Sequence, residues 1–340
     1  MNLTIIGGGS LGHVCAAVAS SQKVHSVNLL TGHPEKWGHR ITATDPTGKQ
    51  YIGTINTISS NPADIIPFSD VILLCLPGYL IEETLVKIKP YLHRHTAVGS
   101  IVSSTGFFFQ AHKTLPSTTS LFGFQRVPYI ARVNEYGKSS FLLGYKKELA
   151  IAVEKHPDKE SLRLFIEGAF LTPTILLESF YEAALTNSNP ILHTARLYTM
   201  WHDWDGTPYD HHILFYKEWD TPSAQKLIDM DNEFFSLLEV LPVRKGIIPP
   251  LLEYYESFNA ESLAKKISSI PAFLSITAPM IQTDQGWIPD FSSRYFTEDF
   301  PFGLKYIKDL STQHNISTPH IDQVLSWGLE KTLNDDKSGL

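Results

Sequence analysis

The amino-terminal half of the chain alternates short apolar runs with amphipathic stretches. Apolar strand-like runs lie at Leu3–Ile6, Ser26–Leu30, Ser69–Pro77 and Thr96–Gly106, and a helical pattern covers Leu80–Tyr91 between the last two. Strands that are apolar throughout and alternate with helices are typical of a parallel sheet buried on both faces. The pattern predicts a doubly wound parallel α/β sheet, that is, a Rossmann-type domain.

The remaining patterns divide the chain in two. Residues 41–55 predict an inserted hairpin that turns at Asp45–Gly48, and residues 122–153 predict further strands that close the first domain. From about Phe180 the pattern becomes helical: one helix is broken by Pro190, another opens with a Thr221 cap and Pro222, and two more cover 299–315 and 317–333. We therefore expect a dinucleotide-binding domain over 1–175 and a helical domain over 176–340.

A glycine-rich loop follows the first predicted strand. Gly7, Gly9 and Gly12 form G-x-G-x-x-G, with a β-branched strand before them and a helical pattern after them, as the dinucleotide fingerprint requires. The three glycines allow the tight turn, the approach of backbone N–H groups to a pyrophosphate, and close packing of helix on strand. With Ser10 and Leu11, which open the helix, they are predicted to bind the cofactor phosphates.

The end of the second strand bears on the choice of cofactor. An NAD site usually has an acidic residue there to hold the ribose 2′-hydroxyl, but this strand ends in Leu30, Thr31 and Gly32. His33, Lys36 and Arg40 follow, and cations near this point would attract a 2′-phosphate. We expect NADP rather than NAD, with NAD still allowed, and with Thr31, Lys36 and Arg40 at the cofactor.

Ligands of such sheets lie at the carboxyl ends of the strands. Pro77 ends the third apolar run and is followed by Gly78 and Tyr79. These residues are predicted to line the nicotinamide side of the cofactor.

Composition narrows the class of protein. The net charge is −7 and no basic block is present, so nucleic acid is not an expected partner. No run approaches ~18 uninterrupted apolar residues, and no secretory signal pattern opens the chain. The two cysteines, Cys15 and Cys75, lie in apolar segments as buried small side chains rather than as a disulfide or metal site. The cytoplasm is the expected compartment, and a homodimer is compatible with the sequence.

Hydride transfer to a carbonyl or imine needs a proton-transfer group, a residue that orients it, and a cation for the substrate carboxylate. His193 lies on an apolar helix just after the domain crossover, and Asn189 lies one turn earlier on the same face. The alternative for His193 is a core histidine bonded to a backbone carbonyl. The other histidines of this region, His202, His211 and His212, match no compact zinc pattern and indicate a loop or a substrate rim.

The segment RYFTEDFPFGL, residues 294–304, supplies the remaining groups. Pro301 suits the first turn of a helix, so Glu298 and Asp299 are expected at its amino end. We interpret Glu298 as an N-terminal capping residue, whereas Asp299 could instead hold the ring of a histidine. Arg294, expected on the preceding loop, has a guanidinium suited to bidentate binding of a carboxylate.

These motifs resemble those of the octopine/nopaline (opine) dehydrogenases. RYFTEDFPFGL resembles the RY-x-x-ED-x-P-x-x-L segment of that family, NPILHTARL its helix with the catalytic histidine, and IIGGGSLGHVCAA its cofactor loop; the resemblance covers nearly the whole chain. It implies that His193 is the acid/base, Asp299 its partner and Arg294 the ligand of the 2-oxo acid carboxylate. Asn189 is expected at the substrate because it shares the helical face of His193. The resemblance further implies an NAD(P)H-dependent reduction of the imine formed by an amino acid and a 2-oxo acid such as pyruvate.

Other functions remain open at this point. Ketopantoate reductases join similar domains but use a lysine at the start of the second, and no lysine lies between Phe180 and Trp201. A hydroxy-acid dehydrogenase would need the same acid/base but no amine. A non-catalytic NADP-binding sensor would keep the glycine loop without needing His193, Arg294 and Asp299 to converge.

Overall fold

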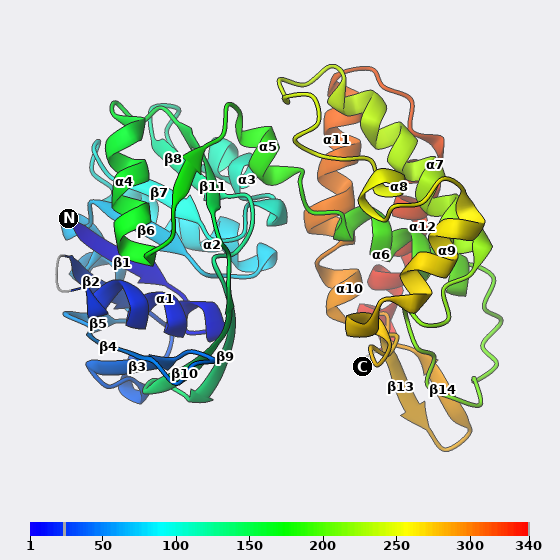
Figure 1. Cartoon of the computed structure of the whole chain (residues 1–340), viewed down its shortest axis with the longest axis horizontal. Helices are drawn as coiled ribbons and strands as arrows, with labels where there is room; N and C mark the ends of the chain where they lie inside the picture. Colours follow the sequence, from blue (N-terminus) through cyan, green and yellow to red (C-terminus); the bar gives the residue numbers. More distant parts are fainter. Residues whose placement is uncertain (23–24, 339–340) are drawn as a thin grey trace. The chain divides into compact units, whose positions relative to one another are not determined.

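The computed structural model describes residues 1–22 and 25–338. The chain divides into two compact units, Met1–Thr186 and Asn187–Leu340 (Figure 1). The division lies after the short helix α5 (Phe180–Ala184), further along the chain than the position 175/176 expected from the sequence.

The first unit is built on an eight-stranded sheet. Its strands are, in spatial order, β12 (Thr174–Leu176), β11 (Leu149–Glu154), β8 (Ser120–Phe124), β7 (Ala97–Ser100), β6 (Val71–Leu74), β1 (Asn2–Ile6), β2 (Ser26–Leu30) and β5 (Ile58–Ser59). Every neighbouring pair is parallel except β8 and β11. The helices of this unit are α1 (Ser10–Ser21), α2 (Gly78–Ile88), α3 (Phe107–Thr114), α4 (Lys159–Phe170) and α5. The doubly wound Rossmann prediction is confirmed.

A second sheet belongs to the same unit. It has the order β4 (Gln50–Thr54), β3 (Arg40–Thr44), β10 (Ser139–Tyr145) and β9 (Tyr129–Glu135). The predicted hairpin joins β3 to β4, and Asp45 closes its turn by accepting the backbone N–H groups of Thr47 and Lys49. Helix α1 packs against strands of both sheets, which makes it the centre of the apolar core (Figure 1).

The second unit is mainly helical, as predicted. Its helices are α6 (Asn189–Trp201), α7 (Thr221–Leu238), α8 (Leu251–Tyr254), α9 (Ala260–Ser269), α10 (Arg294–Thr297), α11 (Lys305–Gln313) and α12 (Pro319–Ser338). A π-helical turn, Phe300–Leu304, precedes α11, and a hairpin of β13 (Met280–Thr283) and β14 (Gly286–Pro289) was not foreseen. Helix α6 contacts α7, α12 and the π-turn within this unit.

Three local expectations are corrected. Thr221 is the first residue of α7, and the cap is Asp220, whose carboxylate accepts the Ser223 N–H at 2.8 Å. Arg294 opens α10 instead of lying on a loop, because the chain is already helical from that residue. Glu298 ends α10, so the residue that precedes the π-turn is Asp299.

Cys15 and Cys75 are both free. Cys15 is buried in the core of the first unit, as expected, whereas Cys75 is only half-buried. Across residues 1–22 and 25–338, none of the helices combines the length and the apolar character that a membrane span requires.

The buried carboxyl of Asp231 gives a pH-dependent contribution to stability. Asp231 lies on α7, is 7% exposed and accepts the Leu251 N–H at 2.8 Å, which fixes the start of α8. Burial raises the pKa of Asp231 to about 6, against 3.8 for an ordinary aspartate. The folded protein therefore holds this proton more tightly than the unfolded chain, so stability falls as pH rises from 4 to 6 and keeps that loss at higher pH.

We expect Asp231→Asn to raise stability at pH 8, since the amide oxygen can still accept the Leu251 N–H without a buried charge. The gain should approach ~2–3 kcal/mol at pH 8 and vanish near pH 4. Thermal unfolding of both proteins at the two pH values measures it. A difference between the two proteins that is the same at both pH values would contradict the assignment.

Candidate active site

The structure brings His193 and Asp299 together, although they are far apart in the sequence. His193 Nδ1 lies 2.8 Å from Asp299 Oδ2, and the residue is 8% exposed. An ionised carboxylate only accepts hydrogen bonds, so Nδ1 carries a hydrogen and donates it to Asp299. This contact fixes the ring orientation and leaves Nε2 as the nitrogen that can exchange a proton.

The π-turn that follows Asp299 explains how the carboxylate is held. Pro301 has no N–H, and the Leu304 N–H bonds to the Asp299 carbonyl at 2.8 Å, five residues back. A Cβ on Gly303 would lie 2.6 Å from Pro190 Cγ, so glycine lets the turn approach the start of α6. Phe300 packs against Phe296 behind the turn. The backbone that carries Asp299 is thus packed directly against the helix that carries His193.

Tyr216 completes this cluster and was not singled out from the sequence. Its hydroxyl lies 2.8 Å from His193 Nε2, on the opposite side of the ring from Asp299. Burial is the main cause that raises the pKa of Tyr216, and the negative charge of Asp299 adds to it. The phenol therefore stays protonated at neutral pH. The segment around it, HHILFYKEW, has no helical or strand period that would have marked Tyr216 as a site residue.

The expected substrate ligands lie near the same helix. Arg294 is exposed; its backbone carbonyl accepts the Glu298 N–H, whereas its side chain has no hydrogen bond or ion pair with any residue in 1–22 or 25–338. Its neighbour Tyr295 packs on the His193 ring with 4.7 Å between centroids. Asn189, also exposed, begins α6 one turn before His193. An uncommitted guanidinium beside the histidine cluster is suited to binding an anionic group.

The glycine loop of the first unit has the geometry of a dinucleotide site. Gly7 has φ +119°, which side chains rarely allow, and a Cβ on Gly12 would lie 2.1 Å from the Gly7 carbonyl oxygen. Gly9 is the N-cap of α1. The loop therefore turns sharply and presents the amino end of α1 to a ligand, as a pyrophosphate requires.

A cavity of about 370 Å³ lies beside this loop, at the carboxyl ends of β1 and β2. Its lining comprises Ile6, Gly7, Gly8, Leu30, Thr31, Gly32, His33, Ser60, Pro62, Leu76, Leu80, Glu83, Thr84, Lys87, Ile88 and Tyr136. The position and the mixed apolar and polar lining suit the adenosine part of a dinucleotide.

Two of the nine predicted cofactor residues line this cavity. Gly7 and Thr31 line it, whereas Gly9, Ser10, Leu11, Gly12, Lys36, Arg40 and Pro77 do not. The Ser10 hydroxyl instead accepts the Val133 N–H at 3.3 Å, and Pro77 precedes α2. Lys36 and Arg40 are exposed and have no ion pair within the described part of the chain. They remain available to a 2′-phosphate.

His13 ties the second sheet to the glycine loop, which the sequence did not reveal. Its Nδ1 faces the Gly9 carbonyl at 2.9 Å, and its Nε2 accepts the Gly137 N–H at 2.7 Å. The ring packs against Trp37 and Tyr136, and its burial lowers the pKa of His13, so the ring stays neutral. Because Tyr136 lines the cavity, His13 holds one wall of this cavity in place.

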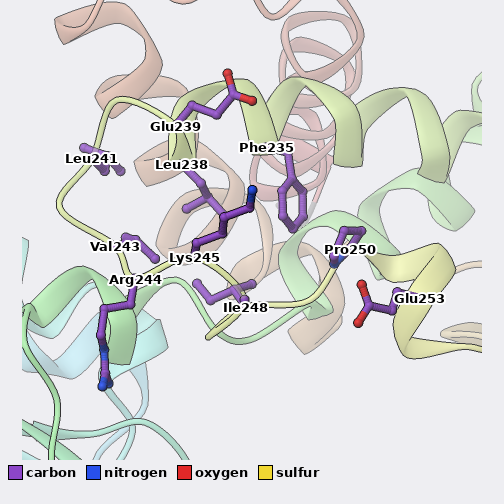
Figure 2. Close-up of a pocket in the computed structure, with 11 residues that line it drawn as sticks. Phe235, Leu238, Glu239, Leu241, Val243, Arg244, Lys245, Ile248, Pro250 and Glu253 are labelled. Carbon is purple, nitrogen blue, oxygen red and sulfur yellow. The ribbon is translucent and has the colours of Figure 1, made fainter.

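The second unit contains a separate cavity of about 540 Å³ between the end of α7 and the start of α8 (Figure 2). Its apolar lining includes Phe235, Leu238, Leu241, Val243, Ile248 and Pro250, and its charged lining comprises Glu239, Arg244, Lys245 and Glu253. Figure 2 shows Lys245 extending toward the α7 side chains and Arg244 extending away from them. The volume is within the range of small-molecule pockets.

Known proteins with similar sequences and structures indicate which activity this chain has. The family model described as "NAD/NADP octopine/nopaline dehydrogenase, alpha-helical domain" matches residues 176–332. Tauropine dehydrogenase of Arabella iricolor is 28% identical over 357 residues, covering 96% of this chain and 90% of that protein. The chain is thus similar to the octopine/nopaline dehydrogenase family, over its helical part by the family model and over nearly its whole length by this relative.

Two further relatives show the same similarity. Octopine dehydrogenase of Pecten maximus is 26% identical over 361 residues, covering 97% of this chain and 90% of its own. A solved structure of octopine dehydrogenase with NADH and L-arginine has a TM-score of 0.86 and 25% identity, covering 97% of this chain and 89% of that one. The protein is thus an NAD(P)-dependent dehydrogenase of the opine type that acts on a CH–NH bond, and its cofactor is a nicotinamide dinucleotide.

Proposed function

We propose that this dehydrogenase reductively condenses a 2-oxo acid such as pyruvate with an amino acid. The amine and the ketone would form an imine, and reduction of the C=N bond would give a secondary amine with two carboxylates. When bound, the nicotinamide supplies the hydride. The observation that carries the proposal is the hydrogen bond of His193 to Asp299 in a chain similar to the octopine/nopaline dehydrogenases, because it supplies an oriented proton-transfer group.

Each residue of the cluster has a role in this proposal. His193 gives a proton to the hydroxyl that leaves during imine formation, or handles the proton of the substrate amine. Asp299 orients the ring through Nδ1. Arg294 binds the carboxylate of the 2-oxo acid, and Asn189 lies on the substrate side of α6.

The deciding experiment is a screen of NADPH oxidation in which 2-oxo acids are paired with a panel of amino acids. We expect oxidation that requires both substrates, with a product whose mass equals their sum less water plus two hydrogens. Oxidation with a 2-oxo acid alone would identify a hydroxy-acid or ketopantoate-type reductase instead. Tight cofactor binding without turnover of any pair would favour a sensor protein.

Arg294→Ala should act on the affinity for the 2-oxo acid. Loss of a bidentate charge-assisted contact should raise the apparent KM for that substrate by about 30–100-fold, with a small effect on NADPH affinity. Steady-state kinetics with each substrate varied in turn measures the difference. Arg294→Lys serves as the matched control, since lysine keeps the positive charge but cannot make the bidentate contact. It should recover part of the affinity for the 2-oxo acid. An unchanged KM for the oxo acid in the alanine variant would exclude this role.

For the cofactor we propose a preference for NADP over NAD. The end of β2 carries no acidic residue, because Leu30 is followed directly by Thr31 and Gly32. The exposed side chains of Lys36 and Arg40 have no ion pair within the described residues. His33 lines the cavity near the same strand end, although it pairs with Glu35 at 3.4 Å. The solved octopine dehydrogenase holds NADH, so cofactor choice is a property in which this chain is proposed to differ from that relative.

Fluorescence titration should show tighter binding of NADPH than of NADH. Lys36→Ala and Arg40→Ala should each weaken NADPH binding by roughly three- to tenfold, as expected for a partly solvated phosphate contact, and leave NADH binding unchanged. Lys159→Ala, which removes an exposed lysine at the start of α4, is the control for the loss of positive charge. Equal affinity for the two cofactors would rule out the preference.

A further inference from the structure

Both ring nitrogens of His193 have a partner within the second unit. Nδ1 faces Asp299 and Nε2 faces the Tyr216 hydroxyl, each at 2.8 Å. Because Nδ1 keeps its hydrogen for the carboxylate, Nε2 is the nitrogen that gains and loses a proton. Any proton that leaves the imidazolium from Nε2 therefore meets the Tyr216 oxygen first.

The ring of Tyr216 is fixed in this position. It stacks on Phe273 with 4.5 Å between centroids and lies nearly parallel to Trp219 at 6.1 Å. Its exposure is 7%. A substrate that reached Nε2 directly would have to displace this ring, break both aromatic contacts and expose buried apolar surface. A path to the substrate through the hydroxyl avoids that displacement.

The hydroxyl can make one more hydrogen bond than the protein supplies. Among residues 1–22 and 25–338, His193 is its hydrogen-bond partner and no other is present. When imidazolium Nε2–H donates to the Tyr216 oxygen, the phenolic hydrogen needs an acceptor elsewhere, because a buried polar hydrogen without one is unfavourable. An oxygen atom of the substrate would fill that place.

Building on the proposed condensation, we propose that Tyr216 is a further catalytic residue, which passes the proton of His193 to the hydroxyl that leaves the carbinolamine. The Nε2–H bond breaks as a new O–H bond forms on Tyr216. The original phenolic O–H bond breaks as its proton reaches the leaving oxygen. The C–O bond then breaks with its electron pair on the departing water, and the nitrogen lone pair forms C=N.

This sequence leaves Tyr216 neutral before and after the step, and His193 ends neutral. Burial and the nearby Asp299 disfavour a phenolate, so the two proton movements belong to one concerted step. A positioning role for Tyr216, in which its hydroxyl only orients the ring, would involve a single moving proton. The number of protons that move in this step therefore distinguishes a relay role from a positioning role.

The test is Tyr216→Phe, which keeps the stacked ring and removes the hydroxyl. In single-turnover NADPH oxidation with an active substrate pair, the rate should fall by about tenfold to a hundredfold. The oxo-acid concentration that gives half of the maximal rate should change little. In mixtures of H₂O and D₂O, the wild-type rate should vary with deuterium fraction along a curve, as for two protons, and the variant rate along a straight line. A wild-type rate in Tyr216→Phe, or a slower rate with an unaltered dependence on deuterium, would overturn the relay.

Two further variants complete the design. Tyr255→Phe removes the hydroxyl of another buried tyrosine of the same unit that has no bond to His193, and it should keep the wild-type rate. The double variant His193→Ala with Tyr216→Phe should have the same rate as His193→Ala alone, because Tyr216 can transfer no proton when His193 is absent. Additive losses would contradict the relay. Absence of any condensation by the wild-type protein would count against the proposed function itself, whereas active wild type with an unaffected Tyr216→Phe would count against the relay alone.

Discussion

Replacing His193 by alanine is expected to lower kcat for the condensation by about 10²–10⁴-fold, the usual contribution of a general acid–base group. The expectation rests on a residue that is 8% exposed, held by Asp299 through Nδ1, and left with Nε2 as its exchangeable nitrogen. NADPH affinity should change little, because the glycine loop and its cavity belong to the first unit. Stopped-flow or steady-state assays of NADPH oxidation measure the loss.

His202→Ala is the matched control for this variant. His202 follows the last residue of the same helix and stacks on Tyr198, and its hydrogen bond and ion pair go to Tyr198 and Asp203 rather than to Asp299 or Tyr216. It should retain a near wild-type kcat. The assignment of His193 as acid/base fails if His193→Ala turns over a proven oxo-acid and amino-acid pair at the wild-type rate.

The sequence predicted the elements whose pattern is local. Uniformly apolar strands such as β6, the glycines at 7, 9 and 12, and the hairpin turn at Asp45–Gly48 each carry their signal within a few residues. The ends of the helices were harder to predict, because the position of a cap depends on which side chain reaches the free N–H groups of the first turn. Asp220 rather than Thr221 caps α7 for that reason.

The site was predictable only where a motif marked it. His193 and Asp299 were paired through a family resemblance, and their hydrogen bond spans 106 positions, which no local period could indicate. Tyr216 lies in an irregular segment, and its role depends on the stack with Phe273 from another part of the chain. The sequence shows His13 only as one more residue of an apolar helix, although its ring contacts Gly9 and also Gly137, which lies 124 positions away from it. Contacts of this range follow from tertiary packing rather than from spacing.

Substitutions of glycines in the cofactor loop should give the second large effect. One substitution should weaken NADPH binding without affecting folding, and another should lower the stability of the fold. Gly9 has φ −80°, which any residue adopts, and a Cβ built on it meets no atom within 4 Å. Gly9→Val should therefore fold normally. Its branched side chain would stand where the backbone must approach a pyrophosphate, so NADPH affinity should fall by about a hundredfold or more, ~2.7 kcal/mol.

Gly12→Ala is the informative comparison for Gly9→Val. Its Cβ would lie 2.1 Å from the Gly7 carbonyl oxygen, a backbone atom that cannot move without opening the turn between β1 and α1. Because α1 is the centre of the core, this smaller substitution should lower the thermal midpoint by several degrees, whereas Gly9→Val should leave it unchanged. Calorimetry and NADPH titration of both variants measure the two effects. Wild-type NADPH affinity in Gly9→Val would show that the phosphates bind elsewhere, because a valine at the N-cap of α1 leaves no room for them there.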